Sequence, residues 1–226
     1  MTFRDYSEPS LRGEAVGPER GQRRRFIYRN GVKRCLDIAL VVLSLPISLP
    51  LVLGMMCLVA LDGSSPLYRQ KRLGRGGRVF DMVKIRTMVP GADALLEYHL
   101  RKNPEARREW DETQKLKTDP RITRIGRFLR KTSLDELPQL WNVLKGDMSL
   151  VGPRPMMVDQ RVLYPGTAYF DLRPGITGLW QISERNETSF AERAGFDSRY
   201  LATVSLSLDV SILLRTVGVV LRGTGY

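Results

Sequence analysis

A 26-residue apolar stretch constrains this chain more than any other feature of its sequence. It runs from Leu36 to Leu61 and carries one charge, on Asp37. At about 1.5 Å per residue, a helix of this length can cross a bilayer hydrocarbon core of roughly 30 Å. A membrane-spanning helix is therefore the default interpretation.

Two features argue instead for a helix that enters the membrane and returns. Pro46 and Pro50 lie in the middle of the stretch, and each proline removes a backbone donor and clashes with the carbonyl four residues earlier. Basic residues also flank both ends, and positive charge marks the cytoplasmic side of a membrane segment. These flanking residues are Arg29, Lys33 and Arg34 upstream, and Arg69, Lys71, Arg72, Arg75 and Arg78 downstream.

We therefore predict a re-entrant helix-break-helix over residues 31–62, with the spanning helix as the alternative. A break near Ser48-Leu49-Pro50, or at Pro46, keeps both ends in the cytoplasm. The hydroxyls of Ser44 and Ser48 can bond backbone groups that the prolines free.

Charge and residue types narrow the function. The net charge is +12, so we expect an anionic partner: nucleic acid, an acidic membrane surface or phosphorylated substrates. Since an apolar segment is present and no zinc finger, RRM or helix-turn-helix signature is found, we expect no nucleic-acid partner. Because His99 is the single histidine, we expect neither a zinc site nor a Ser-His triad. Cys35 lies beside the apolar segment and Cys57 within it, without metal or redox spacing, which predicts buried thiols in a reducing compartment.

Residues 1–30 are rich in charge, Gly, Pro and Ser and have no hydrophobic period, which predicts a mobile basic tail that becomes ordered near Phe26. Its cluster Arg23-Arg24-Arg25 suits the anionic headgroups of inner-membrane lipids. A solvated tail without a binding role is the alternative.

Residues 63–226 predict a small cytoplasmic domain of the α/β class, mainly helical. Gly74, Gly76 and Gly77 precede the loosely alternating residues 79–85, as in a short β-hairpin. Helical spacing from Ala92 to about Lys117, interrupted at Pro104, predicts two helices.

Two further segments have amphipathic patterns. Within the basic residues 115–131, Ile122, Ile125, Phe128 and Leu129 form an apolar stripe. This pattern fits an interfacial helix or the lining of a phosphate site, with a solvated basic face as the alternative. Residues 206–221 are also amphipathic, and we expect them to dock against the membrane or the core. This segment also leaves room for a homodimer.

An adjacent carboxylate pair, Asp135-Glu136, lies within this basic neighbourhood. Pro138 is tolerated only in the first turn of a helix, so a helix starts near Asp135 and its free N–H groups favour an ionised carboxylate and a bound phosphate. One carboxylate could hold a divalent cation while the other attacks phosphorus. A capping box from Ser133 to Glu136 is the competing interpretation, and spacing alone leaves the two even.

Several motifs follow one another along the chain: Lys33-Arg34-x-x-Asp37, Pro50, and the stretches 80–88 (FDMVKIRTM), 119–139 (DPRITRIGRFLRKTSLDELPQ), 146–155 (GDMSLVGPRP) and 173–181 (RPGITGLWQ). In these motifs the chain resembles the small monotopic phosphoglycosyl transferases, which are bacterial sugar transferases, and in particular the exopolysaccharide undecaprenyl-phosphate galactose phosphotransferases of rhizobia. The resemblance covers about residues 32–226.

The resemblance implies a ping-pong transfer of a sugar 1-phosphate from a UDP-sugar to undecaprenyl phosphate at the cytoplasmic face of the inner membrane. Asp135 would be the nucleophile, and Glu136, with Asp135, would hold Mg²⁺. UDP-galactose is favoured by likeness alone. The residues expected to contact phosphates are Lys84, Arg130, Arg154 and Arg173, and those expected at the membrane break are Pro50, Pro46 and Ser48.

Two departures from the family pattern affect these expectations. Leu49 stands directly before Pro50, where relatives often carry serine, so the bend can be placed differently. Glu184 replaces a glycine after Gln181, which changes the expected turn near the nucleotide sugar.

Overall fold

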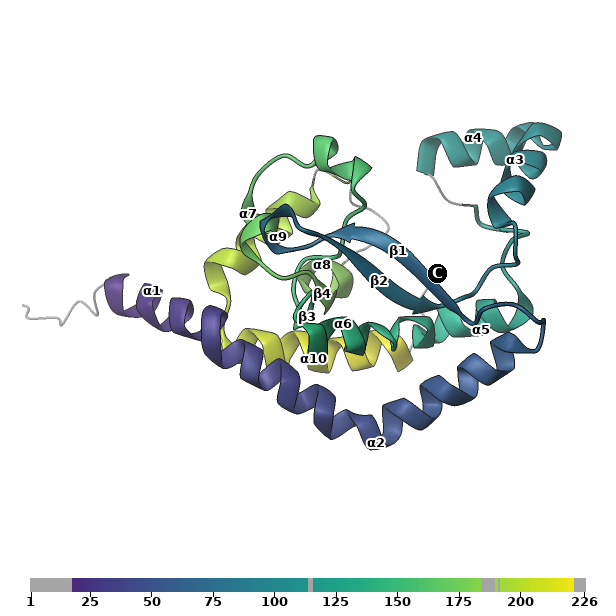
Figure 1. Ribbon diagram of the computed structural model, residues 1–226. Helices are drawn as coiled ribbons and strands as arrows, with labels where there is room; N and C mark the ends of the chain where they lie inside the picture. The colour runs from purple at the N-terminus through teal and green to yellow at the C-terminus, as the bar shows by residue number, and fades with distance from the viewer. Residues whose placement is uncertain (1–17, 114–115, 184–189, 191, 222–226) are drawn as a thin grey trace, which may run out of the picture.

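The computed structural model describes residues 18–113, 116–183, 190 and 192–221, and it is mainly helical (Figure 1). The helices are α1 (Pro18–Ile27), α2 (Lys33–Ala60), α3 (Ala92–Lys102), α4 (Pro104–Thr113), α5 (Arg124–Thr132), α6 (Gln139–Lys145), α7 (Ala168–Asp171), α8 (Leu179–Ile182), α9 (Arg193–Thr203) and α10 (Leu206–Leu221). A π-helical turn, Tyr28–Val32, joins α1 to α2, and 3₁₀ turns occupy Arg75–Gly77, Leu134–Glu136 and Asp159–Leu163. The strands are β1 (Leu67–Leu73), β2 (Val79–Ile85), β3 (Ser149–Val151) and β4 (Gly175–Thr177).

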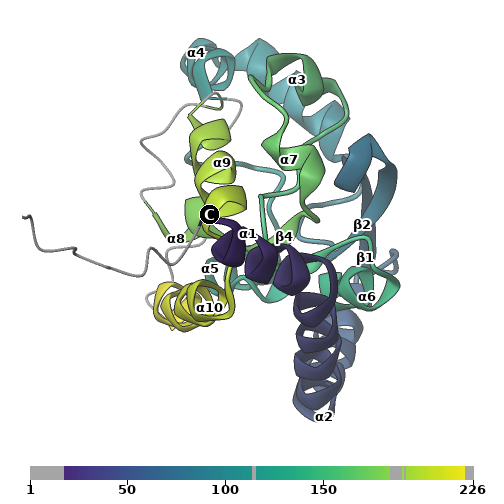
Figure 2. The ribbon, with the colours of Figure 1, turned by 90° about the vertical axis from the view of Figure 1, so that its left-hand side faces the viewer.

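The apolar segment forms one bent helix. Helical conformation continues through Pro46 and Pro50, so the expected break takes the form of a bend and not of a non-helical interruption. Figure 1 shows the ribbon of α2 descending, bending and rising again, and Figure 2 shows it extending beyond α10. Within the described residues, one continuous helical stretch, Gln22–Ala60, is long and apolar enough to cross a membrane, and only 11% of its most apolar window is buried. It is therefore not the core helix of a soluble domain.

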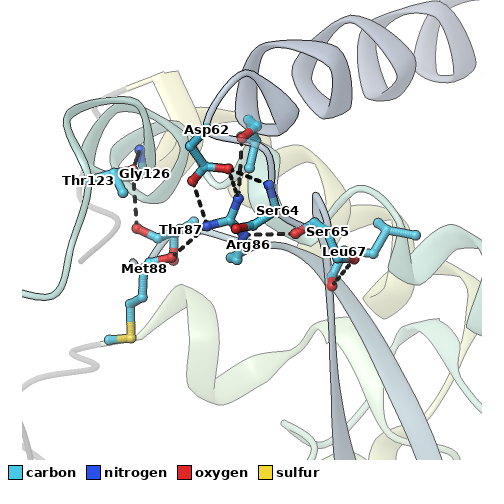
Figure 3. A network of polar contacts seen from close by, with 10 residues as sticks. Asp62, Ser64, Ser65, Leu67, Arg86, Thr87, Met88, Thr123 and Gly126 are labelled. Atoms are coloured by element: carbon cyan, nitrogen blue, oxygen red, sulfur yellow. Dashed lines mark hydrogen bonds and ion pairs between the residues drawn. The ribbon is translucent and has the colours of Figure 1, made fainter. Parts of the chain in front are cut away.

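Both arms of α2 attach to the same domain. In the first arm, the Lys33 ammonium lies 2.6 Å from a carboxylate oxygen of Asp209 on α10, and Asp37 accepts a 2.7 Å hydrogen bond from Ser149 on β3. At the second arm, Arg86 at the end of β2 donates to Asp62 and to the carbonyl of Val59 (Figure 3). Among the described residues, none tethers the middle of the helix in this way, and Leu43 and Ile47 are 76% and 78% exposed.

The polar groups of α2 differ from expectation. Ser44 donates a 2.8 Å hydrogen bond to the carbonyl of Val41, whereas the buried hydroxyl of Ser48 has no partner among the described atoms. Cys35 and Cys57 are exposed, so the prediction of buried thiols was wrong. The reason is that most of α2 faces away from the protein core.

The N-terminal region is more regular than its composition suggests. Helical conformation begins at Pro18, earlier than the ordering predicted near Phe26, and continues into α2. The side chains of Arg23 and Arg24 are exposed, and Arg25 donates a hydrogen bond to the carbonyl of Ala202 at the end of α9. Residues 1–17 of the predicted tail lie outside the described residues.

The predicted hairpin and the predicted pair of helices are confirmed. Strands β1 and β2 pair antiparallel from Leu67↔Ile85 to Leu73↔Val79. Gly76 and Gly77 make the turn with φ of 68° and 77°, a left-handed conformation that favours glycine. Asn103 separates α3 from α4 and caps α4 by accepting from two of its first backbone N–H groups. Helices α3 and α4 lie at the edge of the molecule opposite α2 (Figures 1 and 2).

Helices α5 and α10 are amphipathic, as predicted, and both expose apolar side chains, which on α5 lie among the exposed basic residues Arg124, Arg127 and Lys131. On α5, Ile125 and Phe128 are 38% and 54% exposed while Leu129 is buried. Ile122 precedes the helix and pairs with Met88, so it lies outside the predicted stripe. On α10 the exposed residues recur at helical spacing: Leu206, Val210, Leu214 and Val217.

A small parallel pair, β3 and β4, was not predicted. Ser149 pairs with Gly175 and Val151 with Thr177. The backbones approach so closely that a Cβ at Gly152 would lie 2.3 Å from the carbonyl oxygen of Arg173, and only glycine fits there. This contact places the Arg154 loop beside α8, which carries Trp180.

Candidate active site

Asp135 lies in a tight turn between α5 and α6. Ser133 ends α5 with φ of 56°, a left-handed conformation that is strained for a residue with a side chain. A 3₁₀ turn, Leu134–Glu136, follows, and α6 begins at Gln139 after Pro138. The side chain of Ser133 makes no capping hydrogen bond, so the competing capping box does not form.

The Asp135 carboxyl is buried in a basic setting. Only 8% of Asp135 is exposed to solvent. Burial raises its pKa from 3.8 to about 6, the charges of Lys84 and Arg130 oppose that rise, and the charge of Glu136 adds to it. Near neutral pH the group is therefore an ionised carboxylate with little hydration, which favours attack on an electrophile.

Glu136 and Lys84 form the second part of the site. The Lys84 ammonium lies 2.8 Å from a carboxylate oxygen of Glu136, and both side chains are about four-fifths buried. Lys84 comes from β2, where it pairs with Tyr68 of β1. The hairpin therefore brings a cation to the carboxylate pair.

Arg130 reaches the site from α5 and is positioned by Thr87. Its Nε donates a 2.9 Å hydrogen bond to the Thr87 hydroxyl. The start of α5 packs on the same residue, because a Cβ on Gly126 would lie 2.0 Å from the Thr87 carbonyl oxygen. Thr123 caps α5 by accepting from the Gly126 N–H (Figure 3).

The carboxylate pair fits a magnesium ion in one specific mode. Mg²⁺ is usually bound through one or two carboxylates plus substrate phosphates and water. Asp135 and Glu136 supply two adjacent carboxylates, and the described residues contain no cluster of three or more His, Cys, Asp or Glu side chains. A bound phosphate would therefore have to complete the coordination.

Arg154 lies in a different group, with aromatic and basic partners. Its guanidinium lies 5.8 Å from the centre of the Trp180 ring. Arg193 of α9 lies 5.0 Å from the same ring and donates a 2.9 Å hydrogen bond to the Arg154 carbonyl. Burial lowers the pKa of Arg72 to about 10, and the charge of Arg154 contributes to this effect. The sequence analysis missed Arg72 and Arg193 as site residues, because nothing local distinguishes them from other arginines.

Arg173 belongs to a third group and does not join Asp135. Its Nε donates a 3.1 Å hydrogen bond to the carbonyl of Gly146, just after α6. Arg34 of α2 donates to the carbonyls of Val143 and Leu144 at the same helix end. Positive charge is favourable at a helix C-terminus, which accounts for this contact, and the phosphate contact of Arg173 stays a prediction.

An apolar pocket of about 490 Å³ lies between the bend of α2, the hairpin and α6. Its wall includes Leu137 and Pro138, which directly follow the carboxylate pair. Ser48, Leu49 and Val52 line it from α2. The pocket therefore lies between α2 and the residues that follow the carboxylate pair in the sequence. Glu184, where the sequence departs from the family pattern, lies outside the described residues.

Comparisons with known proteins agree on one family. The sequence model of the family described as bacterial sugar transferase matches residues 28–223. The chain is 50% identical over 196 residues to the UDP-galactose-lipid carrier transferase of Erwinia amylovora, covering 86% of this chain and 41% of that protein. It is 47% identical to the undecaprenyl-phosphate galactose phosphotransferase of Salmonella typhimurium, covering 86% of this chain and 41% of that protein. It is 46% identical to the exopolysaccharide production protein ExoY of Rhizobium meliloti, covering 85% and 87%. The chain thus spans about two fifths of the first two relatives and most of the third.

Proposed function

The chain belongs to the bacterial sugar transferase family, and from this premise we propose that it transfers a sugar 1-phosphate from a UDP-sugar to undecaprenyl phosphate, releasing UMP. The observation that carries the proposal is the buried Asp135 carboxylate beside Lys84, Arg130 and Glu136. Such a group suits nucleophilic attack on an anionic phosphate, because the neighbouring cations offset the repulsion between the two negative charges.

In the first half-reaction, an Asp135 carboxylate oxygen attacks the β-phosphorus of the UDP-sugar. An oxygen–phosphorus bond forms, and the bond from that phosphorus to the bridging oxygen breaks. The electron pair remains on the bridging oxygen, which leaves as part of UMP. The sugar phosphate is then held on Asp135 as an acyl phosphate.

In the second half-reaction, a phosphate oxygen of undecaprenyl phosphate attacks the same phosphorus. The bond to Asp135 breaks, the carboxylate is regenerated, and the product is a diphosphate-linked sugar on the lipid. The apolar pocket beside Leu137 and Pro138 supports a lipid acceptor, because it can enclose part of an isoprenoid chain close to the acyl phosphate.

Mg²⁺ is part of the proposal, with Glu136 and Asp135 as its protein ligands. Bound there, the ion would screen the charge of the substrate phosphates. Lys84 holds the Glu136 carboxylate in place at 2.8 Å, and Arg130 supplies further positive charge. Arg154 is proposed to contact donor phosphate through its bidentate guanidinium.

The proposed location is the cytoplasmic face of the bacterial inner membrane, with α2 as a re-entrant helix. Both arms of α2 contact the same domain, which supports a re-entrant helix. Such contacts are most simply made when both ends of α2 lie on one side of the membrane. The exposed apolar faces of α5 and α10 would lie in the headgroup layer. The names of the relatives favour UDP-galactose as the donor and exopolysaccharide assembly as the setting.

Release of UMP tests the reaction. Purified full-length protein in nanodiscs, with Mg²⁺ and undecaprenyl phosphate, should release UMP from one or more of a panel of UDP-sugars, with UDP-galactose expected to be best. Without the lipid, donor labelled in its β-phosphate should label the protein, and hydroxylamine, which cleaves acyl phosphates, should remove that label. Asp135→Asn should abolish both signals, and full activity in that variant would disprove the nucleophile assignment.

Cysteine labelling tests the topology. Cysteines introduced singly at Arg29 and Arg78 in a cysteine-free background should react only with reagent on the cytoplasmic side. Reaction from opposite sides would mean that α2 spans the membrane.

A further inference from the structure

Three arginines gather on the hairpin and the segments packed against it. Arg72 extends from β1, Arg154 follows β3, and Arg193 begins α9. Each acts on another as a like charge: Arg154 and Arg193 both disfavour the charged form of Arg72, and Arg154 disfavours that of Arg193. Arg193 is buried and the other two are partly buried. Holding three guanidinium groups together with reduced hydration is unfavourable unless a negative charge joins them.

The described part of the chain supplies little of that negative charge. None of the three arginines forms an ion pair with a carboxylate among the described residues. The carboxyl that acts on Arg193 is Asp197, which accepts a 2.9 Å hydrogen bond from Tyr164. Burial raises the pKa of Asp197 to about 6, so its negative charge is itself disfavoured. The cluster keeps a net positive charge.

The hydrogen bonds of the cluster leave donors unused. Arg72 donates to the Pro155 carbonyl at 3.2 Å and to the Gln70 side chain at 2.6 Å, and its buried Nε has no partner among the described atoms. A guanidinium has five N–H donors in a planar fork that matches the oxygens of a phosphate.

Aromatic rings fix the orientation of two members. The Arg193 guanidinium lies 5.0 Å from the Trp180 ring centre and 4.8 Å from that of Phe190, and the Arg154 guanidinium lies 5.8 Å from Trp180. Such stacking holds the planar groups in place before a ligand arrives, which reduces the entropy lost on binding.

The cluster and the carboxylate pair share one face of the hairpin. Side chains two residues apart in a strand point to the same face, so Arg72, Gln70 and Tyr68 lie in a row, and Lys84 pairs with Tyr68. The bond to Gln70 draws the Arg72 guanidinium toward Lys84. Along β1, the backbone positions of Gln70 and Tyr68 are two residues or roughly 7 Å apart. This is about the length of a diphosphate with its outer oxygens.

We propose that Arg72, Arg154 and Arg193 form the subsite for the nucleoside-side phosphate of the donor, the phosphate that leaves as part of UMP. The inference rests on the proposed function. With the β-phosphorus at Asp135, the α-phosphate points along the hairpin toward the cluster. The leaving UMP gains negative charge as the bridging bond breaks, and the three cations stabilise that charge.

Binding of UMP tests the subsite without turnover. UMP and uridine are titrated calorimetrically into the full-length Asp135→Asn protein in nanodiscs. UMP should bind, and uridine, which has no phosphate, should bind at least roughly tenfold more weakly. Adding Arg72→Met, Arg154→Met or Arg193→Met should weaken UMP binding roughly tenfold or more, because each removes a charge-assisted contact to phosphate.

Lys71→Met is the matched control. Lys71 is the strand neighbour of Arg72 on the opposite face of β1, with 74% of its side chain exposed, so its loss removes the same charge without touching the cluster. Melting temperatures are compared for all variants, so that a loss of affinity caused by misfolding is recognised. Unchanged UMP affinity in the arginine variants, or an equal loss in Lys71→Met, would overturn the inference.

Steady-state kinetics of the arginine variants that retain Asp135 distinguish the phosphate of the donor from the phosphate of the lipid acceptor. The arginine variants should raise KM for the UDP-sugar and leave KM for undecaprenyl phosphate within about twofold. A rise confined to the lipid KM would overturn the inference, because the cluster would then serve the acceptor phosphate. If wild-type protein releases no UMP from any UDP-sugar, the proposed function fails, and UMP titration still decides whether the arginines form a nucleotide phosphate site.

Discussion

Replacing the buried Asp135 with asparagine should stabilise the fold while removing the nucleophile. The two side chains have nearly the same shape, so the main change is loss of a negative charge from a site with 8% exposure. Because burial raises the pKa of the Asp135 carboxyl to about 6, the ionised form is disfavoured in the folded protein despite Lys84 and Arg130.

The sign and size of the effect follow from proton linkage. Between pH 3.8 and about 6 the folded protein holds a proton that the unfolded chain has released, so the stability of the wild type falls as the pH rises. Above that range, ionisation of Asp135 lowers the free energy of unfolding by its full amount, about 3 kcal/mol. Asparagine carries no charge, so Asp135→Asn should be more stable than wild type by about 3 kcal/mol at pH 8 and by roughly 1 kcal/mol at pH 4.5.

Thermal unfolding in nanodiscs with EDTA measures this difference without bound metal. At pH 8 the melting temperature of the variant should lie roughly 6–12 °C above that of wild type, and the gap should narrow at pH 4.5. Asp81→Asn, at a carboxylate with 57% side-chain exposure, serves as the control for the chemical change itself. A variant that melts below wild type at pH 8, or a gap that does not vary with pH, would refute the burial argument.

Three further predictions concern the elements around the carboxylates. Gly126→Ala should destabilise the fold by about 1–3 kcal/mol and reduce UMP release, because its Cβ would lie 2.0 Å from the Thr87 carbonyl oxygen. Denaturant unfolding measures the change in stability, and an unchanged stability would contradict the close packing. Val52→Trp should fill the apolar pocket and raise KM for undecaprenyl phosphate, while UMP release without lipid stays unchanged. Leu53→Trp, at the exposed neighbouring residue outside the pocket, should leave KM for undecaprenyl phosphate unchanged. Lys84→Met should shift the acidic limb of single-turnover UMP release to higher pH, because Lys84 lowers the pKa of Asp135; a shift to lower pH would exclude this role.

The elements predicted correctly depend on residues that are close in the sequence. The turn at Gly76-Gly77, the interruption before Pro104 and the apolar stretch from Leu36 to Leu61 each follow from local backbone preferences or local hydropathy. The helix through Pro46 and Pro50 was less predictable, since proline indicates a bend without deciding whether hydrogen bonding continues around it.

The candidate site was predictable only in part. Asp135 and Glu136 could be found because they are adjacent in a basic stretch and match a family motif. Arg173 matches a motif too, yet it binds the end of α6. Arg72 and Arg193 could not be identified from the sequence. They join the proposed site only because the fold brings Arg72 near Arg154 and Arg193 onto the Trp180 ring.

The sequence by itself determined that this protein has an apolar helix with basic flanks, a prolyl bend, a glycine-turned hairpin and a carboxylate pair beside cations. These properties arise from side-chain chemistry and from neighbours within a few residues. Tertiary structure alone decided which polar partner meets which carboxylate: Lys84 reaches Glu136 from 52 residues away, and Ser149 donates to Asp37 from 112 residues away. Such pairings depend on how the hairpin, the short parallel strands and both arms of α2 pack together, and no local pattern encodes that packing.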